Sequence, residues 1–247
     1  MYALTNNARR ARKLAHISSR RAYWPALRLK VFPAIEHESL FEAFAFDTVL
    51  DVGANVGQFA VVAAALAPGA RVHSFEPIGS CYETLEAIAR AYPAITPHRY
   101  ALGASAGETE INVSAYVGSS SILAFAEAQE RIYPGTSVAR RERIAVRTLA
   151  EIADTLPVEG RTLLKLDVQG FELEVLKGAE PVLSRVGHVY LEGSFVELYE
   201  GQALAGEIVA WLAQRGFTLR SVANVDTGAD RLPAQADFLF ARATSAA

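Results

Sequence analysis

The sequence predicts an α/β fold with a mostly parallel β-sheet and helices on both of its faces. The first observation is that short apolar runs alternate with amphipathic or Ala-rich segments from residue 46 onward, which is typical of βαβ units. The second is a glycine-spaced turn at residues 51–57, directly after the first apolar run, where such sheets bind ligands. The third is a pair of apolar runs near the C-terminus with no helix between them, which predicts an antiparallel edge hairpin in a seven-stranded sheet.

The first half of the predicted sheet consists of three strands connected by two helices. The helices are bounded by breaking residues, Pro68-Gly69 after the first and Pro93 after the second, because proline and glycine end helices. The predicted strands are residues 48–52, 71–75 and 96–101, and the predicted helices are residues 57–67 and 80–91.

The second half contains an insertion and four further strands. Residues 108–115 alternate apolar and polar side chains and are expected to pair with residues 144–148 beside the main sheet. Residues 116–143 are weakly patterned, and a long loop of that kind in a compact domain is usually functional or mobile. The remaining predicted strands are residues 162–168, 188–191, 217–222 and 237–242, with helices at 171–177 and 204–214.

Composition and length agree with a compact enzyme. The 247 residues carry a net charge of −3 and are 51% hydrophobic, and no apolar run reaches the ~18 residues of a membrane span. The charged N-terminus is not followed by an apolar segment, so no signal peptide is predicted. The single cysteine, Cys81, excludes an intramolecular disulfide and a cysteine-based metal site, and indicates a reducing, cytoplasmic setting.

The turn at residues 51–57 indicates the class of cofactor. Gly53 and Gly57 allow the backbone to approach a ligand closely, and the following helix points its N-terminal N–H groups into the turn. The pattern D-x-G-x-N-x-G lacks the glycines of the dinucleotide fingerprint G-x-G-x-x-G, and Asp51 would repel a pyrophosphate. A carboxylate there suits a ligand with an ammonium group, such as S-adenosylmethionine. The alternative is an ordinary tight turn in a βαβ unit.

Glu76 ends the second predicted strand, 25 positions after Asp51. A carboxylate at this place can accept two hydrogen bonds from a ribose 2′,3′-diol, as an acidic residue does in NAD sites. Together the two acids predict a nucleoside ligand that is not a dinucleotide.

Four acidic residues follow or end predicted strands, and the carboxyl ends of parallel strands meet at one edge of a sheet. Each acid could merely cap the next helix, but four at one edge favour a ligand site: Asp51, Glu76, Asp167 and Glu192. Asp167 could steer a sulfonium, orient an acceptor hydroxyl or act as its base. Lys165, on the same strand face, could pair with it. Magnesium on Asp167 and Glu192 is a possible variant, but no ligand cluster indicates a metal.

A methyl transfer to an alcohol needs one positioned base, and histidine is the usual candidate near pH 7. Of the five histidines, His37 lies before the first strand and is free to fold over the site as part of a cap. His37 is therefore the predicted base.

The first 30 residues carry eight basic side chains and no acid: Arg9, Arg10, Arg12, Lys13, Arg20, Arg21, Arg28 and Lys30. Such an arm can contact nucleic acid or an anionic membrane, or can be a solvated extension. Tyr23, Trp24 and Leu27 lie among the basic residues and indicate that part of the arm docks. We assign residues 1–45 to a basic arm and cap, and residues 46–247 to the cofactor-binding domain.

The chain resembles the FkbM-type S-adenosylmethionine-dependent O-methyltransferases over about residues 35–242. The matching segments are residues 51–57, 75–77, 101–103, 119–121, 164–170 with Glu172, and 176–179. The resemblance implies a Rossmann-like class I methyltransferase fold. It implies that Gly53, Asn55 and Gly57 contact the methionine half of the cofactor, that Glu76 with Pro77 contacts the ribose, and that Ala101 and Leu102 lie near the adenine.

On the acceptor side, the resemblance draws attention to Ser119, Ser120 and Ser121, with Glu192 as a further candidate. Family substrates are hydroxyls of sugars or polyketide-like products, and residues 198–202 and 235–237 look like the polysaccharide-associated members. The expected activity is therefore O-methylation of a sugar or glycoconjugate. The expected location is the cytoplasm, with possible contact between the basic arm and the inner membrane face.

Two other functions stay open from the sequence. A nucleic-acid methyltransferase would suit the basic arm, but the amino-methylating kind places Asn/Asp-Pro-Pro-Tyr/Phe after the fourth strand, where this chain has Asp167-Val168-Gln169-Gly170. A degenerate module could keep the cofactor fold without the activity. The acceptor, its hydroxyl position and the oligomeric state do not follow from the sequence.

Overall fold

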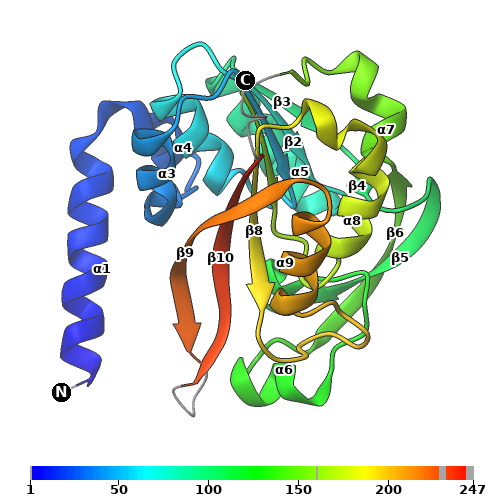
Figure 1. The fold of residues 1–247 in the computed structure, drawn as a ribbon. Coiled ribbons are helices and arrows are strands. Elements are labelled where there is room, and N and C mark those ends of the chain that lie inside the picture. The colour runs from blue at the N-terminus through cyan, green and yellow to red at the C-terminus, as the bar shows by residue number, and fades with distance from the viewer. Residues whose placement is uncertain (1, 160, 228–231, 243–247) are drawn as a thin grey trace.

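The structure is a computed structural model that describes residues 2–159, 161–227 and 232–242. A seven-stranded sheet crosses the molecule in the order β3-β2-β1-β7-β8-β10-β9 (Figure 1). Five strands are parallel neighbours: β1 (Thr48–Val52), β2 (Arg71–Phe75), β3 (Ile95–His98), β7 (Thr162–Leu166) and β8 (His188–Ser194). Strand β10 (Pro233–Arg242) runs antiparallel to β8 and to the edge strand β9 (Phe217–Thr227). The predicted fold class is confirmed.

The central strands are apolar because helices cover both of their faces. One face packs under α7 (Leu149–Ile152), α8 (Glu172–Ala179) and α9 (Ala205–Ala213), and the other under α4 (Gln58–Leu66) and α5 (Gly79–Ala91). Every residue of β1 and β7 is buried. This double cover holds the carboxyl ends of β1, β2 and β7 at one edge, where the predicted site lies.

The N-terminal segment joins the core on the α4 side. Its elements are α1 (Tyr2–Ser19), η1 (Arg21–Tyr23), α2 (Trp24–Arg28), η2 (Ile35–His37) and α3 (Glu38–Ala43). Ile17, Tyr23 and Phe41 are buried in the same apolar cluster as Val49 and Phe59. Helix α1 itself extends from this cluster to the N-terminus, at the edge of the molecule in this view (Figure 1). The sequence indicated docking near Tyr23 but did not predict helix α1; the side chains of Arg9 and Arg10 lie outside the described residues.

The insertion differs from the prediction in two ways. Ala101–Leu102 form a separate strand, β4, so the third main strand ends at His98 rather than at residue 101. β4 pairs with β6 (Val138–Arg147), which pairs with β5 (Gly107–Ser114), in a second sheet of three strands. β6 begins six residues earlier than predicted because its first half is charged and exposed, and so lacks the apolar alternation of a half-buried strand.

The segment between β5 and β6 is also more ordered than its weak pattern predicted. It contains the short helices η3 (Val117–Ser119) and α6 (Glu127–Ile132). Asn112 and Ser121 form an isolated bridge that ties the segment to β5. The hydroxyl of Ser121 also donates to the carbonyl of Gln169, just after β7, and this holds the segment against the carboxyl edge of the main sheet.

Candidate functional site

Two cavities lie side by side at the carboxyl edge of the sheet. The second, of about 680 Å³, is the larger. Five residues line both cavities and so mark where they meet: Gly53, Asn55, Gly118, Asp167 and Gln169. A group bound in one cavity can therefore contact a group bound in the other at this junction.

The turn after β1 packs directly on the turn after β7. Gly53 has φ +75°, and a Cβ atom added to it would lie 1.9 Å from the carbonyl oxygen of Asp167. The N–H groups of Gly53 and Ala54 donate to the carbonyl of Phe75. Asn55 also has a positive φ, of 49°, which asparagine tolerates better than most residues. Only glycine at position 53 lets the two turns come this close.

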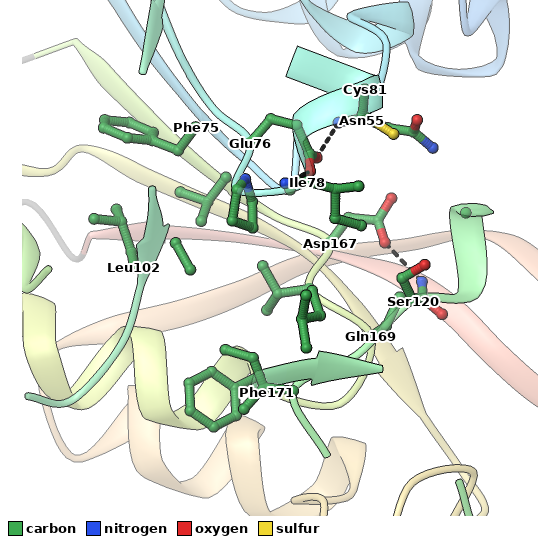
Figure 2. A pocket seen from close by; sticks show the side chains of 18 of the residues that line it. Asn55, Phe75, Glu76, Ile78, Cys81, Leu102, Ser120, Asp167, Gln169 and Phe171 are labelled. Carbon is green, nitrogen blue, oxygen red and sulfur yellow. Dashed lines mark hydrogen bonds between the residues drawn. The ribbon is translucent and has the colours of Figure 1, made fainter. Parts of the chain in front are cut away.

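Glu76 lines the first cavity, and two backbone N–H groups hold its carboxylate in place. Its Oε2 accepts the N–H of Asn55 at 2.8 Å and its Oε1 accepts the N–H of Ile78 at 2.7 Å (Figure 2). Each oxygen keeps a second lone pair, so the carboxylate can still accept hydroxyl donors. Burial raises the pKa of Glu76 to about 7, against the lowering effect of these two N–H donors. A hydroxyl donor in the cavity would favour the charged form.

The rest of the first cavity divides into an apolar and a polar end. Phe75, Leu102 and Phe171 lie at one end, and Asn55, Asp167, Ser120 and Gln169 lie at the other (Figure 2). Pro77 and Ala101 complete the lining beside Glu76. Apolar side chains next to a buried carboxylate suit a nucleoside, with its flat base in the apolar end and its ribose at Glu76.

Asp51 has a partner within the protein. Its carboxylate is fully buried in β1, and Lys165 Nζ lies 2.9 Å from its Oδ1. Lys165 is the register partner of Asp51 on the neighbouring strand β7, and also donates to the carbonyl of Gly53 at 3.2 Å. Although burial opposes its charge, Asp51 and Asp167 raise the pKa of Lys165. The ammonium group that the sequence led us to expect from a ligand is thus supplied by Lys165, and Asp51 lines neither of the two cavities.

Gly57 and Ser121 also take structural positions. Gly57, with φ +91°, faces Leu85 and Ile88 of α5 rather than either cavity. Ser121 is buried, and its hydroxyl donates to the carbonyl of Gln169 at 2.6 Å. Gly57 brings α4 and α5 together, and Ser121 anchors the turn after β7, so both support the site without lining it.

The turn after β7 is organised by two side chains that received no role from the sequence. Gln169 has φ +54°, and its Nε2 donates to Asp167 at 2.8 Å and to Glu192 at 3.0 Å. Its Oε1 accepts the hydroxyl of Tyr199 at 2.7 Å. Glu172 accepts the N–H groups of Val168 and Gly170. The side chain of Asp167 remains 43% exposed at the junction of the two cavities.

The sequence left open a magnesium ion bound between Asp167 and Glu192. In the structure the amide of Gln169 lies between these two carboxylates and donates to both. Burial, together with the charge of Asp167 and Asp237, raises the pKa of Glu192 well above its usual range. Across the described ranges no group of three or more His, Cys, Asp or Glu residues is placed to hold a metal ion. Glu192, which also accepts from Gln235 at 2.7 Å, is better suited to hydrogen bonding than to cation binding.

His37 lies in the second cavity, as expected of a cap residue. Its lining neighbours there include Lys165, Asp167, Glu192 and Asp237. Burial lowers the pKa of His37, against the opposing effect of Asp237 and Glu36, so the ring is neutral near pH 7. Ser119 lines this second cavity and Ser120 the first. The structure thus brings His37, Asp167, Glu192, Ser119 and Ser120 to one pair of cavities.

Fold and site together define an α/β protein with an apolar cavity around a buried carboxylate and a larger, polar cavity next to it. Residues 51–219 match the family model described as "Methyltransferase FkbM domain". The chain belongs to this family, as the sequence motifs predicted, and S-adenosylmethionine is its methyl donor. The residues of the first cavity fit this cofactor, because an apolar pocket for a base lies next to a buried carboxylate for its ribose.

The chain is similar to several characterised proteins over part of its length. It is 30% identical to the AMB antimetabolite synthetase AmbE of Pseudomonas aeruginosa over 58% of this chain and 8% of that protein. It is 30% identical to the hexuronic acid methyltransferase AglP of Haloferax volcanii over 62% of this chain and 58% of that protein. The chain therefore spans less than two thirds of the length of either relative.

A solved structure of an uncharacterised protein from Listeria monocytogenes shares the fold. Its TM-score is 0.50 at 9% identity, over 85% of this chain and 68% of that one. At this identity the likeness concerns the fold alone.

Proposed function

We propose that the protein is an O-methyltransferase that acts on a hydroxyl of a sugar or glycoconjugate. The observation that carries the proposal is the junction of the two cavities at Asp167. A methyl donor in the first cavity would meet an acceptor in the second there, and alignment of the two is the main catalytic requirement of such a displacement. The hexuronic acid methyltransferase AglP, similar over 62% of this chain, supports a sugar as the class of acceptor, although the charges of the second cavity argue for a neutral sugar rather than an acidic one.

S-adenosylmethionine, when bound, supplies an electrophilic methyl group. The residues of this chain would then do three things. Glu76 accepts the ribose hydroxyls, Asp167 orients the acceptor hydroxyl or steers the positive charge beside it, and His37 removes the hydroxyl proton. The second cavity offers hydrogen-bonding side chains for the other hydroxyls of a sugar, among them Ser119, Gln58, Gln235 and Glu192. Aromatic rings suited to packing on a sugar face lie at Phe32, Tyr116 and Tyr133.

The charges of the second cavity favour an acceptor without anionic groups. Among the described residues that line it, the lysines are Lys13 and Lys165. Lys13 pairs with Glu36 at 2.7 Å and Lys165 with Asp51 at 2.9 Å. The same lining carries the carboxylates of Asp167, Asp226 and Asp237. An acceptor carboxylate would therefore meet like charges and find both lysines already paired.

The basic N-terminal segment supports a second element of the proposal, contact with an anionic membrane surface. Trp24 and Phe32 are exposed beside Arg21 and Lys30, and residues 11–33 contain no acidic side chain. Phe32 and Lys13 also line the second cavity, which would place its mouth near a membrane-bound acceptor. None of the described helices is both long and apolar enough to cross a membrane. Sedimentation with vesicles containing anionic lipid, against neutral vesicles, tests this contact.

The activity is tested by incubating the protein with methyl-labelled S-adenosylmethionine and methyl glycosides of the gluco, galacto and manno series. Label in an O-methyl ether of a sugar supports the proposal, and the Asp167→Asn variant should lose it. The same assay is run in parallel with RNA and DNA as acceptors, and label there but not in sugars would favour the nucleic-acid alternative. Binding of S-adenosylhomocysteine without transfer to any acceptor would favour an inactive cofactor-binding module.

A further inference from the structure

His37 is held by two side chains from neighbouring strands of the sheet. Its Nδ1 lies 2.9 Å from the hydroxyl of Tyr190 in β8 and 3.5 Å from Oδ2 of Asp237 in β10. The Tyr190 hydroxyl donates to the same Asp237 oxygen at 2.8 Å. Asn224 of β9 also donates to it, at 2.7 Å. The ring edge packs on Phe59, with centroids 5.3 Å apart.

These contacts determine which nitrogen of His37 carries the proton. A tyrosine hydroxyl has one proton, and here the proton goes to the carboxylate of Asp237. The hydroxyl can then offer only a lone pair to His37, so Nδ1 must be the donor and Nε2 the unprotonated acceptor. Burial, followed by the charge of Asp237, raises the pKa of Tyr190, so the hydroxyl keeps its proton.

The remaining nitrogen is free to act. Within the described part of the chain, Nε2 of His37 has no hydrogen-bond partner, and the side chain lines the second cavity. We propose that Tyr190 and Asp237 are positioning residues that fix His37 as the Nδ1–H tautomer, so that its Nε2 takes the proton of the acceptor hydroxyl. The inference rests on the proposed function for the identity of the acceptor.

The methyl transfer needs only the acceptor hydroxyl, the methyl donor and Nε2 of His37. The acceptor oxygen forms a bond to the methyl carbon, the carbon–sulfur bond breaks with its electron pair going to sulfur, and the hydroxyl proton moves to Nε2. The imidazolium that results has its Nδ1–H directed at Tyr190 and Asp237, whose negative charge stabilises it. The proton then leaves to solvent through the second cavity.

The proposal adds residues that the family match does not cover. His37 and Asp237 lie outside residues 51–219, and Tyr190 lies within them. The charged groups that act on His37 come from several elements: Glu36 beside it, Lys165 and Asp167 from β7 and its following turn, and Asp237 from β10. Asp237 makes the closest of these charge contacts with the ring, so a variant there should change the titration most.

The test is nitrogen-15 NMR of the full chain with labelled histidines, in the presence of S-adenosylhomocysteine. The signals of His37 are assigned as those that disappear in the His37→Asn variant. We expect a pyrrole-like Nδ1 and a pyridine-like Nε2 near neutral pH. Asp237→Asn should lower the pKa of His37, and Tyr190→Phe should give a mixture of tautomers. Asp226→Asn is the matched control, because it removes the same charge from the same cavity lining but contacts Tyr133 instead.

A proton on Nε2 in the wild type, or a His37 titration that neither variant changes, would overturn the inference. Circular dichroism of the two variants separates misfolding from a local effect. On a sugar acceptor, each variant should lose about 10-fold or more in kcat, a part of the roughly 10²–10⁴-fold that a positioned base contributes, with a shifted acid limb of the pH profile. A pyrrole-like Nδ1 and a pyridine-like Nε2 without methyl transfer to any sugar would contradict the proposed function but leave the tautomer assignment intact.

Discussion

The two cavities that meet at Asp167 are assembled in different ways. The first is lined by residues between Val52 and Phe171, all inside the family match, and combines apolar side chains with backbone turns and one buried carboxylate. The second draws on residues from Lys13 to Asp237, at both ends of the chain, and is lined by charged, amide and aromatic side chains. The first cavity is therefore built from the turns after β1, β2 and β7 and from the inserted segment, all within the family match, whereas the second also needs segments from both ends of the chain.

In the proposed function, the first cavity serves the cofactor and the second serves the acceptor. In the first cavity, tight turns, Glu76 and an apolar end would hold the nucleoside of the cofactor. The second contains the residues that would choose an acceptor. Changes in the first cavity should impair cofactor binding, and changes confined to the second should spare it.

The largest effect on stability is expected at Gly53, which lines both cavities and packs on the backbone of Asp167. Gly53→Ala places a Cβ against the backbone of Asp167 and strains a left-handed residue, which should cost about 3 kcal/mol or more of the free energy of unfolding. Gly69→Ala is the matched control, because Gly69 has φ +86° but nothing within 4 Å of an added Cβ, and should cost only about 1–2 kcal/mol. Equal losses in urea denaturation would show that the contact between the two turns is unimportant.

Asp167→Asn should separate the two halves. We expect turnover to fall by about 10² or more, because a group that orients the acceptor hydroxyl or steers the charge beside it is lost, while affinity for S-adenosylhomocysteine changes only a few-fold. Turnover and calorimetric titration measure the two quantities, with Asp154→Asn as the control of equal charge, because Asp154 is exposed and lines neither cavity. Near-normal turnover on a true acceptor would remove Asp167 from the catalytic set.

Glu76 should act on the cofactor half alone. Glu76→Ala loses charge-assisted hydrogen bonds to the ribose worth about 1.5–3 kcal/mol each, and therefore weakens S-adenosylhomocysteine binding at least about tenfold. Unchanged affinity would contradict the ribose assignment.

The same residue predicts a pH dependence. Burial raises the pKa of Glu76 to about 7, so the carboxylate is charged above that pH and gains a proton as the pH falls through it. Affinity for S-adenosylhomocysteine should thus decline on acidification through about pH 7, and Glu76→Gln should flatten the profile. A wild-type profile as flat as that of the variant would assign the dependence to another group.

The smallest effect concerns acceptor charge in the second cavity. With Lys13 and Lys165 both paired, a hexuronic acid should be methylated at least about tenfold less efficiently than the neutral hexose of the same configuration, since like charges across an interface are strongly disfavoured. The comparison is made as kcat/KM for matched glycosides. A uronic acid that performs as well as the hexose would mean that another cation serves the acceptor.

The same contrast explains what the sequence could and could not predict. The strand Thr48–Val52, its turn and the position of Glu76 followed from an apolar run, glycine spacing and strand-end chemistry, which are local. The partner of Asp51 did not, because Lys165 becomes its neighbour only through the pairing of β1 with β7. The contacts of Tyr190 and Asp237 with His37 could not be predicted for the same reason, since they depend on the antiparallel pairing of β8 with β10. The strand Ala101–Leu102 was misplaced because a run of two residues carries no periodic signal.

Calorimetric titration of the full chain with S-adenosylhomocysteine, run beside NAD at about pH 8, tests the central claim most directly. The cofactor half predicts binding of S-adenosylhomocysteine with a Kd in the micromolar range, weakened in Glu76→Ala, and no binding of NAD. Binding of NAD instead, or of neither ligand, would contradict the assignment of the first cavity to the nucleoside of the methyl donor.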